Sequence, residues 1–408
     1  MLAKIIYLSA IIVLSLSCGT QSSKYPAKEK KAKAGQPVET QKPNADYKPA
    51  FTGQTRIGSV KTTTPIAIDL LAKDLGRPWA AVTLPDGRLL ITEKSGYMVI
   101  RDNNGNLIKK ITGFPDVDDD GQGGLLDVAA DPSYNVNKII YWSFSEPHED
   151  GNLTAVAKGL LNEVAGVIEN PRVIFRATPV FNSSLHFGSR LVFDKDGNLF
   201  VSSGERSDPD GRKQAQWLHS GLGKIFKITP DGNPAPDNPF IYQQGTMPEI
   251  FAFGFRNVQS LDIHPVTGEL WEAEFGPRGG DELNLIKPGK NYGWPVITYG
   301  IEYSGDEIGE AIQQKEGMAQ PVYYWDPVLS PSGMTFYKGN TIPEWENNLF
   351  IGGLSSTHIC RLVLDNNKVT GEERLLAEKG ERFRDIAYAE GMLYAVTDAG
   401  NLYRISKK

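Results

Sequence analysis

Cysteine is scarce in this sequence of 408 residues: Cys18 and Cys360 are the two present, so an internal disulfide framework is not expected. Positive charge is not in excess either. The 43 Lys and Arg against 49 Asp and Glu give a formal net charge of -6, which argues against nucleic acid as a partner, because phosphate binding needs a basic face. Helical periodicity is hard to find beyond residue 65. With 40% hydrophobic residues, the chain still has enough apolar side chains for a large core.

Residues 1–17 have the pattern of an export signal. One Lys precedes an apolar run that is too short to span a bilayer stably, and small residues stand before Cys18. The pattern resembles a bacterial lipoprotein signal, in which the cysteine becomes the lipidated first residue. Ser15 stands where such signals usually have Leu, so a plain secretory signal is the alternative. Either pattern predicts an exported protein, periplasmic or held at the outer membrane or cell surface by a lipid anchor only.

Residues 18–64 are predicted to form a flexible linker and lead-in. The first part is rich in Ser, Lys, Pro, Gln and Ala and has almost no large apolar residues, which is typical of a solvated tether. The lysine-rich residues 28–33 are interpreted as a solvated stretch of this linker.

Residues 65–408 repeat one local pattern, in which an apolar segment, a turn with Asp or Gly and a second apolar segment follow one another. Recurring antiparallel hairpins over this length predict an all-β fold, a six-bladed β-propeller of four-stranded antiparallel sheets with about 55 residues in each blade. The copies are unevenly spaced, so the blade number rests on length and not on period. The turn glycines of the clearest copies are Gly87, Gly197, Gly268 and Gly391.

Residues 251–295 carry more polar chemistry than a strand pair needs. They contain the Arg256–Asn257 pair, a Gly-Pro turn, an Asp-Glu pair and an aromatic corner at residues 291–294. A guanidinium and an amide suit carboxylates, whereas backbone carbonyls and carboxylates suit a hard cation. The segment therefore predicts an anion site beside an oxygen-lined metal site, as a calcium-bound, polyanionic cofactor would require.

An ordered series of motifs over residues 66–405 resembles the soluble quinoprotein sugar dehydrogenases, and more specifically their broad-specificity aldose dehydrogenases. The family consists of six-bladed propellers that use pyrroloquinoline quinone (PQQ) and calcium to oxidise aldoses. The resemblance implies oxidation of an aldose at C1 to the lactone. It leaves the electron acceptor unknown and the choice between monomer and homodimer open. The motifs are GQGGLLDVAADP (121–132), HFGSRLVFDKDGNLFVSSGE (186–205), GKIFKITPDGNPAPDNPF (223–240), FGFRN (253–257), GPRGGDELNLIKPGKNYGWP (276–295) and ERFRD (381–385).

The resemblance implies that His186 is the general base. It would take the proton of the anomeric hydroxyl while hydride passes from that carbon to the quinone, with Glu205 as the acidic partner and Arg256 beside them. An imidazole suits this role because it titrates near neutrality, and a carboxylate can fix its tautomer. A structural histidine is the alternative. The histidines without a comparable setting are His148, His219, His264 and His358.

PQQ is a planar tricarboxylate, so its binding site needs several fixed cations and hydrogen-bond donors. Arg382 and Arg384 stand at positions i and i+2 of an expected strand, so their side chains should face the same side, as a cofactor site would need. The alternative is that they form surface ion pairs with Glu381 or Asp385. At the place where the family commonly has a lysine, this chain has Ser355, and Lys338 is a candidate replacement. The cofactor-binding residues implied by the resemblance are Gln122, Arg256, Asn257, Arg382 and Arg384.

The resemblance also implies two calcium sites and a sugar platform. The carbonyls of Gly276 and Pro277 would bind the cofactor's calcium, and Trp325 would lie against the sugar. The acidic residues 116–120 are interpreted as a solvated loop. Two other functions stay open: a calcium-dependent propeller lactonase, and a non-enzymatic sugar-binding or adhesion propeller. The implied ligands of the second, structural calcium are Asp281, Glu282 and the carbonyl of Tyr292.

Overall fold

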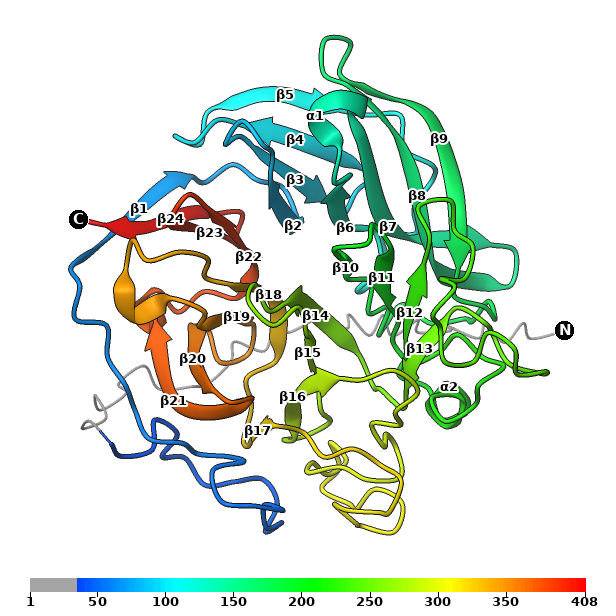
Figure 1. The fold of residues 1–408 in the computed structure, drawn as a ribbon, viewed down its shortest axis with the longest axis vertical. Coiled ribbons are helices and arrows are strands. Elements are labelled where there is room, and N and C mark those ends of the chain that lie inside the picture. Colours follow the sequence, from blue (N-terminus) through cyan, green and yellow to red (C-terminus); the bar gives the residue numbers. More distant parts are fainter. Residues whose placement is uncertain (1–34) are drawn as a thin grey trace, which may run out of the picture. The chain divides into compact units, whose positions relative to one another are not determined.

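The computed structural model describes residues 35–408, and within this range six four-stranded antiparallel sheets stand around a common centre (Figure 1). The prediction of a six-bladed β-propeller is therefore confirmed. The expected signal at residues 1–17, Cys18 and the start of the expected linker lie outside the described residues. No helix in residues 35–408 is long and apolar enough to cross a membrane.

In each sheet the first strand lies next to the centre and the later strands follow outward (Figure 1). Blade 1 contains β2 (Pro78–Thr83), β3 (Leu89–Glu93), β4 (Tyr97–Arg101) and β5 (Leu107–Ile111). Blade 2 contains β6 (Leu125–Ala130), β7 (Ile139–His148), β8 (Gly151–Asn162) and β9 (Val167–Arg176). Blade 3 contains β10 (Leu191–Phe193), β11 (Leu199–Ser202), β12 (Lys224–Ile228) and β13 (Ile250–Phe253).

The second half of the ring repeats this order. Blade 4 contains β14 (Val258–Ile263), β15 (Leu270–Glu274), β16 (Asp281–Ile286) and β17 (Tyr323–Trp325). Blade 5 contains β18 (Pro331–Phe336), β19 (Leu349–Gly353), β20 (Ile359–Asp365) and β21 (Lys368–Leu375). Blade 6 contains β22 (Phe383–Ala389), β23 (Met392–Thr397), β24 (Leu402–Lys407) and, as its outermost strand, β1 (Ile66–Ala72).

Blade 6 is built from both ends of the propeller. β1 pairs antiparallel with β24, from Ile66 opposite Lys407 to Ala72 opposite Leu402. The last blade therefore depends on the first strand, and this pairing closes the ring.

The turn glycines found in the sequence lie in the first hairpins of blades 1, 3, 4 and 6, where all four have a positive φ between 70° and 83°. An L side chain is strained in this conformation, which explains glycine there. The first hairpins of the other two blades contain α1 (Tyr134–Asn137) and the 3₁₀ helix η1 (Pro343–Trp345) instead. These two connections do not have the short glycine turn of the other four, which made the repeats look unevenly spaced. The remaining short helices of the described residues are α2 (Pro209–Gln214) and η2 (Ala377–Lys379).

A buried guanidinium joins the inner strands at the centre. Arg190, just before β10, contacts Asp127 of β6 and Asp385 of β22 through Nη1 at 3.1 Å each, and its Nε donates to the carbonyl of Gln259 of β14 at 2.7 Å. Its guanidinium also lies over the ring of Trp79 of β2, 4.2 Å from the centroid. A buried guanidinium needs carboxylate and carbonyl partners of this kind. Since the partners of Arg190 lie on several inner strands, the cluster fixes the strands of several blades against one another.

Residues 35–64 lie along blades 4 and 5. The backbone N–H of Asn44 donates to Asp326 at 2.8 Å, the buried Gln54 donates to the carbonyl of Pro321 at 2.9 Å, and Trp345 donates to Thr62 at 2.6 Å. Over these residues the structure differs from the expected flexible linker, because polar side chains bind the segment to the blade surface even though it has little apolar content.

Candidate functional site

Nine of the predicted site residues occupy two kinds of position in the blades. Each lies either at the start of an innermost strand or in the loop between the second and third strands. In an antiparallel sheet these two positions are at the same end, so residues from different blades meet at one end of the centre. The residues in these positions are Gln122, His186, Glu205, Arg256, Asn257, Gly276, Pro277, Arg382 and Arg384.

His186 and Glu205 form a buried pair, as predicted. The ring Nδ1 lies 2.7 Å from Glu205 Oε1, and the two side chains come from the loops on either side of β10 and β11. With Nδ1–H donated to the carboxylate, Nε2 is left as an acceptor, and none of residues 35–408 forms a hydrogen bond with it. The pair therefore holds an imidazole in the tautomer that can accept a proton.

Burial lowers the pKa of His186 to about 4, and the charge of Arg256 acts in the same direction. Glu205 raises this pKa, but by less than the other two effects lower it. The imidazole is therefore neutral at pH 7 and ready to act as a base.

Two predicted residues hold the loop that carries His186. Gln122 accepts a hydrogen bond from the backbone N–H of His186 at 2.9 Å, and Asn257 accepts one from Gly188 at 3.0 Å. These bonds support a backbone with a φ of 49° at His186, a conformation that an L residue rarely adopts. A strained residue held in this way is typical of a functional site.

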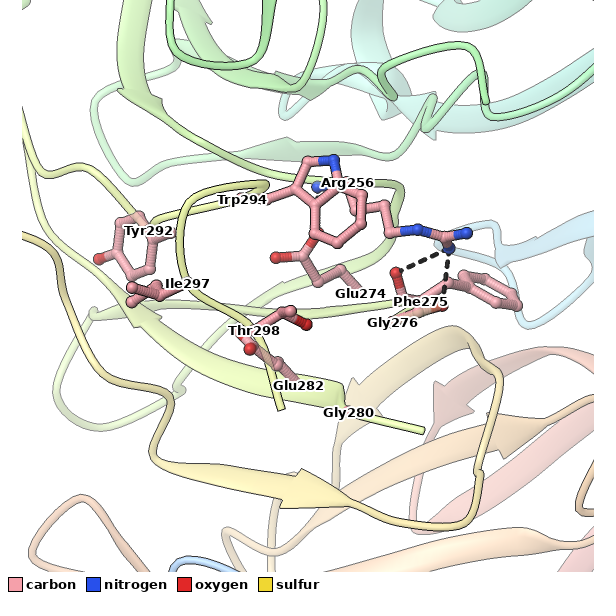
Figure 2. Close-up of a pocket in the computed structure, with 10 residues that line it drawn as sticks. All are labelled: Arg256, Glu274, Phe275, Gly276, Gly280, Glu282, Tyr292, Trp294, Ile297 and Thr298. Atoms are coloured by element: carbon pink, nitrogen blue, oxygen red, sulfur yellow. Dashed lines mark hydrogen bonds between the residues drawn. The ribbon is translucent and has the colours of Figure 1, made fainter. Parts of the chain in front are cut away.

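The side chain of Arg256 has no carboxylate partner in the described part of the chain. Its Nη1 donates to the carbonyls of Gly276 at 2.6 Å and Phe275 at 3.2 Å, as Figure 2 shows, and its guanidinium lies 5.3 Å from the ring centroid of Trp294. Its Nε is buried without a partner. A buried cation with a free donor fits a site for an anion.

Arg382 and Arg384 point to the same side, as the i and i+2 spacing predicts, and both bind Asp398. Each Nε lies 2.8 Å from an oxygen of that carboxylate. The alternative of ion pairs with Glu381 or Asp385 is wrong, because Glu381 binds Thr397, Asn401 and Tyr403 while Asp385 binds Arg190. Two guanidinium groups share one carboxylate, which leaves one positive charge for another anion.

The predicted calcium ligands fall into two groups. Gly276 lies against Gly280 so closely that a Cβ on it would be 2.3 Å from Gly280 C, which explains the glycine. Its carbonyl faces Arg256. In residues 35–408 no three or more His, Cys, Asp or Glu side chains gather closely enough to hold a metal alone. A calcium ion here would therefore need backbone carbonyls such as those of Gly276 and Pro277.

Asp281 and Glu282 do not share a site. They are neighbours on β16, so their side chains point to opposite faces, and Asp281 accepts backbone N–H groups of Gly276, Leu329 and Ser330. Glu282 instead lies opposite Glu274 on β15. Burial raises the pKa of Asp281 to about 6.

Glu274 and Glu282 enter one pocket from neighbouring strands, as Figure 2 shows. Burial raises the pKa of Glu274 to about 8 and that of Glu282 well above its ordinary value, and the charge of Glu274 raises the pKa of Glu282 further. Nearby, Oε2 of Glu272 and Oδ1 of Asn284 are buried without partners. Asn284 Nδ2 donates to Glu272 and Glu282, but too few donors are present for all of these acceptor oxygens, and such a crowded set fits a cation. The residues lining this pocket are Arg256, Glu274, Phe275, Gly276, Gly280, Glu282, Tyr292, Trp294, Ile297 and Thr298.

Trp325 does not join this group. It ends β17, the outermost strand of blade 4, is 6% exposed and packs edge-on against Tyr323 in the apolar core. A residue this buried offers little accessible surface to a sugar, so its role as a platform stays a prediction that this placement does not favour.

Three partner residues were missed from the sequence. Asp398 binds both arginines, Glu274 accepts the backbone N–H groups of Arg256 and Asn257, and Arg206 donates to the carbonyl of Leu185 beside His186. Arg206 follows Glu205 directly and was the one open to prediction. The other two lie in distant strands or loops, where no local pattern marks them.

Fold and site together define a six-bladed propeller with a neutral, buried histidine and several guanidinium groups at one end of its centre. The family model described as Glucose / Sorbosone dehydrogenase matches residues 75–404, and the chain belongs to this family. The predicted resemblance is thereby confirmed.

Relatives support the assignment. The aldose sugar dehydrogenase YliI of Escherichia coli (strain K12) is 39% identical over 349 residues, which cover 84% of this chain and 93% of that protein. The crystal structure of the soluble aldose sugar dehydrogenase from Escherichia coli in the apo form has a TM-score of 0.81 at 38% identity, covering 84% of this chain and 100% of that one. The PQQ-bound aldose sugar dehydrogenase from Streptomyces coelicolor has a TM-score of 0.69 at 27% identity, covering 85% and 99%.

Proposed function

We propose that this protein is a PQQ-dependent aldose sugar dehydrogenase that oxidises its substrate at C1 to the lactone. The observation that carries the proposal is the neutral His186, held by Glu205 beside guanidinium groups that lack enough carboxylate partners. The names of the relatives, one of which has PQQ bound, support the same activity.

In this proposal His186 Nε2 accepts the proton of the anomeric hydroxyl. Glu205 keeps the proton on Nδ1 and stabilises the imidazolium that forms. Gln122 and Asn257 hold the loop, so that the imidazole keeps its position during the transfer. The bound quinone supplies the two-electron acceptor for the hydride of C1, a chemistry that no side chain offers.

The chain's cations would bind the carboxylates of the quinone. Arg256 has a free buried donor, and Arg382 and Arg384 share a single carboxylate, so each can accept a further anionic partner. Gln122 and Asn257 have amide nitrogens for further hydrogen bonds.

Calcium would bind at two places. The carbonyls of Gly276 and Pro277 would hold one ion together with the cofactor's oxygens. Glu282 and the Tyr292 carbonyl would hold the second, and Glu274, not Asp281, is the nearby carboxylate that faces the same pocket. A divalent ion there would offset the repulsion between the buried carboxylates.

Reconstitution tests the proposal. Metal-free, quinone-free protein is given PQQ, calcium or both, and dye reduction is followed on adding several aldoses. Activity that needs both additions is expected. A calcium-dependent lactonase would instead hydrolyse a lactone with calcium alone, and a non-enzymatic propeller would bind no quinone and reduce no dye.

We also propose that the protein is exported and anchored through a lipid on Cys18. The support is the pattern of residues 1–17. Labelled palmitate should be incorporated into the full chain but not into a Cys18→Ala variant, and equal labelling of both would contradict the anchor.

A further inference from the structure

A cation from blade 1 lies at the same end of the propeller as the site. Lys94 directly follows β3, and its Nζ donates to the carbonyl of Gly121 at 2.6 Å. The backbone carbonyl of Lys94 accepts from Leu125 at 2.9 Å, so the residue is fixed at both its main chain and its ammonium group. Gly121 immediately precedes Gln122, whose side chain holds the His186 loop. The ammonium group therefore stands beside the site.

The charge of Lys94 is not balanced by a carboxylate. The charged groups around it are Arg77, Arg384, Asp398 and Asp119, and no ion pair to Lys94 occurs within residues 35–408. Arg77 already pairs with Asp119 at 2.6 Å.

Asp398 already forms ion pairs with two arginines. Lys94, Arg382 and Arg384 are three cations that face this one carboxylate, so two positive charges remain without a partner. Burial lowers the pKa of Lys94 to about 8, and the charges of Arg77 and Arg384 act in the same direction, so the charged ammonium group carries a cost that comes first from burial and then from these cations. A bound anion would remove that cost.

The position has a counterpart in the other blades. Lys94 follows the second strand of blade 1, as Ser355 follows that of blade 5 and Asp398 that of blade 6. Lys338 lies instead in the loop between the first and second strands of blade 5, at the opposite end, so the structure excludes it as the replacement for the missing lysine.

We propose that Lys94 is a carboxylate-binding residue of the cofactor site and supplies from blade 1 the cation that Ser355 does not supply from blade 5. The inference rests on the proposed function, because it assigns the ligand of Lys94 as a carboxylate of PQQ. Together with Arg382 and Arg384 it forms a three-cation cluster against that ligand.

Equilibrium binding tests this role without relying on turnover. PQQ plus calcium is titrated into metal-free, quinone-free protein, and quenching of protein fluorescence reports binding. Lys94→Gln should weaken binding at least about tenfold, the usual loss for one charge-assisted hydrogen bond, whereas Lys94→Arg should lose much less. Lys338→Gln is the matched control and should bind as the unaltered protein does. The thermal midpoints of all four proteins should agree.

The trimethyl ester of PQQ separates a direct contact from a structural one. The ester carries no carboxylate charge, so Lys94→Gln and the unaltered protein should bind it equally. If Lys94→Gln weakens binding of the ester as much as binding of PQQ itself, Lys94 acts by placing Gln122 and the inference is overturned. If Lys94→Gln binds PQQ normally while Arg384→Gln does not, the inference fails and the proposed function stands. If the unaltered protein binds no quinone, the proposed function itself fails.

Discussion

At the scale of single residues, the pKa of His186, the proposed base, is set by burial more than by its partner Glu205. A His paired with Glu usually has a raised pKa, yet at His186 burial and Arg256 outweigh Glu205 and lower it to about 4. The hydrogen bond to Glu205 fixes which ring nitrogen of His186 carries the proton, and burial together with Arg256 keeps the ring neutral.

The charge state of His186 can be measured directly. In quinone-free protein we expect the ring to stay neutral down to about pH 4, because its pKa is lowered from the ordinary 6.5. Between these values the unfolded chain binds a proton that the folded protein does not, so this residue reduces folding stability as the pH falls through that window. NMR titration of the imidazole, assigned with a His186→Ala variant, tests this, and a midpoint near 6.5 would contradict it.

Two substitutions separate chemistry from binding. His186→Ala should lower kcat about 10²- to 10⁴-fold, the range for loss of a general base, and leave PQQ affinity nearly unchanged. Arg382→Ala should mainly weaken PQQ binding, because it removes a cation that shares Asp398 with Arg384. The readouts are steady-state kinetics at saturating PQQ and a fluorescence titration. Equal losses of affinity in both variants would sink these role assignments.

The sequence predicted which candidate site residues lie close together better than it predicted their partners. His186, Glu205, Gln122, Arg256 and Asn257 meet as expected. Asp398 could not be predicted as the partner of Arg382, because that contact joins residues 16 positions apart across a hairpin. Asp281 and Glu282 were grouped because they are adjacent in sequence, although adjacency in a strand places them on opposite faces.

At the scale of elements, the inner strands are held by Arg190 and its two aspartates. On β18, Gly333 leaves room for this cluster, because a Cβ there would lie 1.5 Å from Asp385 Oδ1. The carbonyl of Arg384 also accepts from Arg190 at 3.4 Å, so the cluster supports a predicted cofactor residue. The position of the site thus depends on packing at the centre.

Removing the central guanidinium should cost far more than removing a surface one. Arg190→Met should lower the free energy of unfolding by about 3–5 kcal/mol, because it leaves Asp127 and Asp385 buried without their cation. The matched control is Arg176→Met, which breaks a pair with Glu146 at an arginine side chain that is 45% exposed and should cost less than about 1 kcal/mol. Urea unfolding of both variants checks this. Equal losses would show that the central cluster does not hold the blades.

At the scale of the whole molecule, the ring depends on a strand from its N-terminal end. The sequence predicted the propeller from hairpin repeats, but it could not show that β1 completes the last blade, because the pairing of β1 with β24 joins residues that are far apart in the chain, such as Ile66 and Lys407. Long sequence separation also explains why the attachment of residues 35–64 to the blades was not predicted. Their partners, such as Asp326, lie far along the chain.

Truncation tests this closure. Removal of residues 1–34 should leave a folded, quinone-binding protein, whereas removal of residues 1–72 should give an aggregating or unfolded one. The longer deletion takes away β1 and exposes the edge of β24. Circular dichroism, thermal melting and size-exclusion chromatography report the difference. A stable monomer without β1 would contradict the proposed closure.

The most direct test of the central claim is anaerobic mixing of PQQ- and calcium-loaded protein with an aldose while the quinone spectrum is recorded. We predict that the oxidised quinone spectrum disappears on adding sugar, that deuterium at C1 slows this change, that one lactone forms per quinone, and that the His186→Ala variant shows no fast phase. An unchanged spectrum with every aldose tried, although quinone and calcium are bound, would contradict the account.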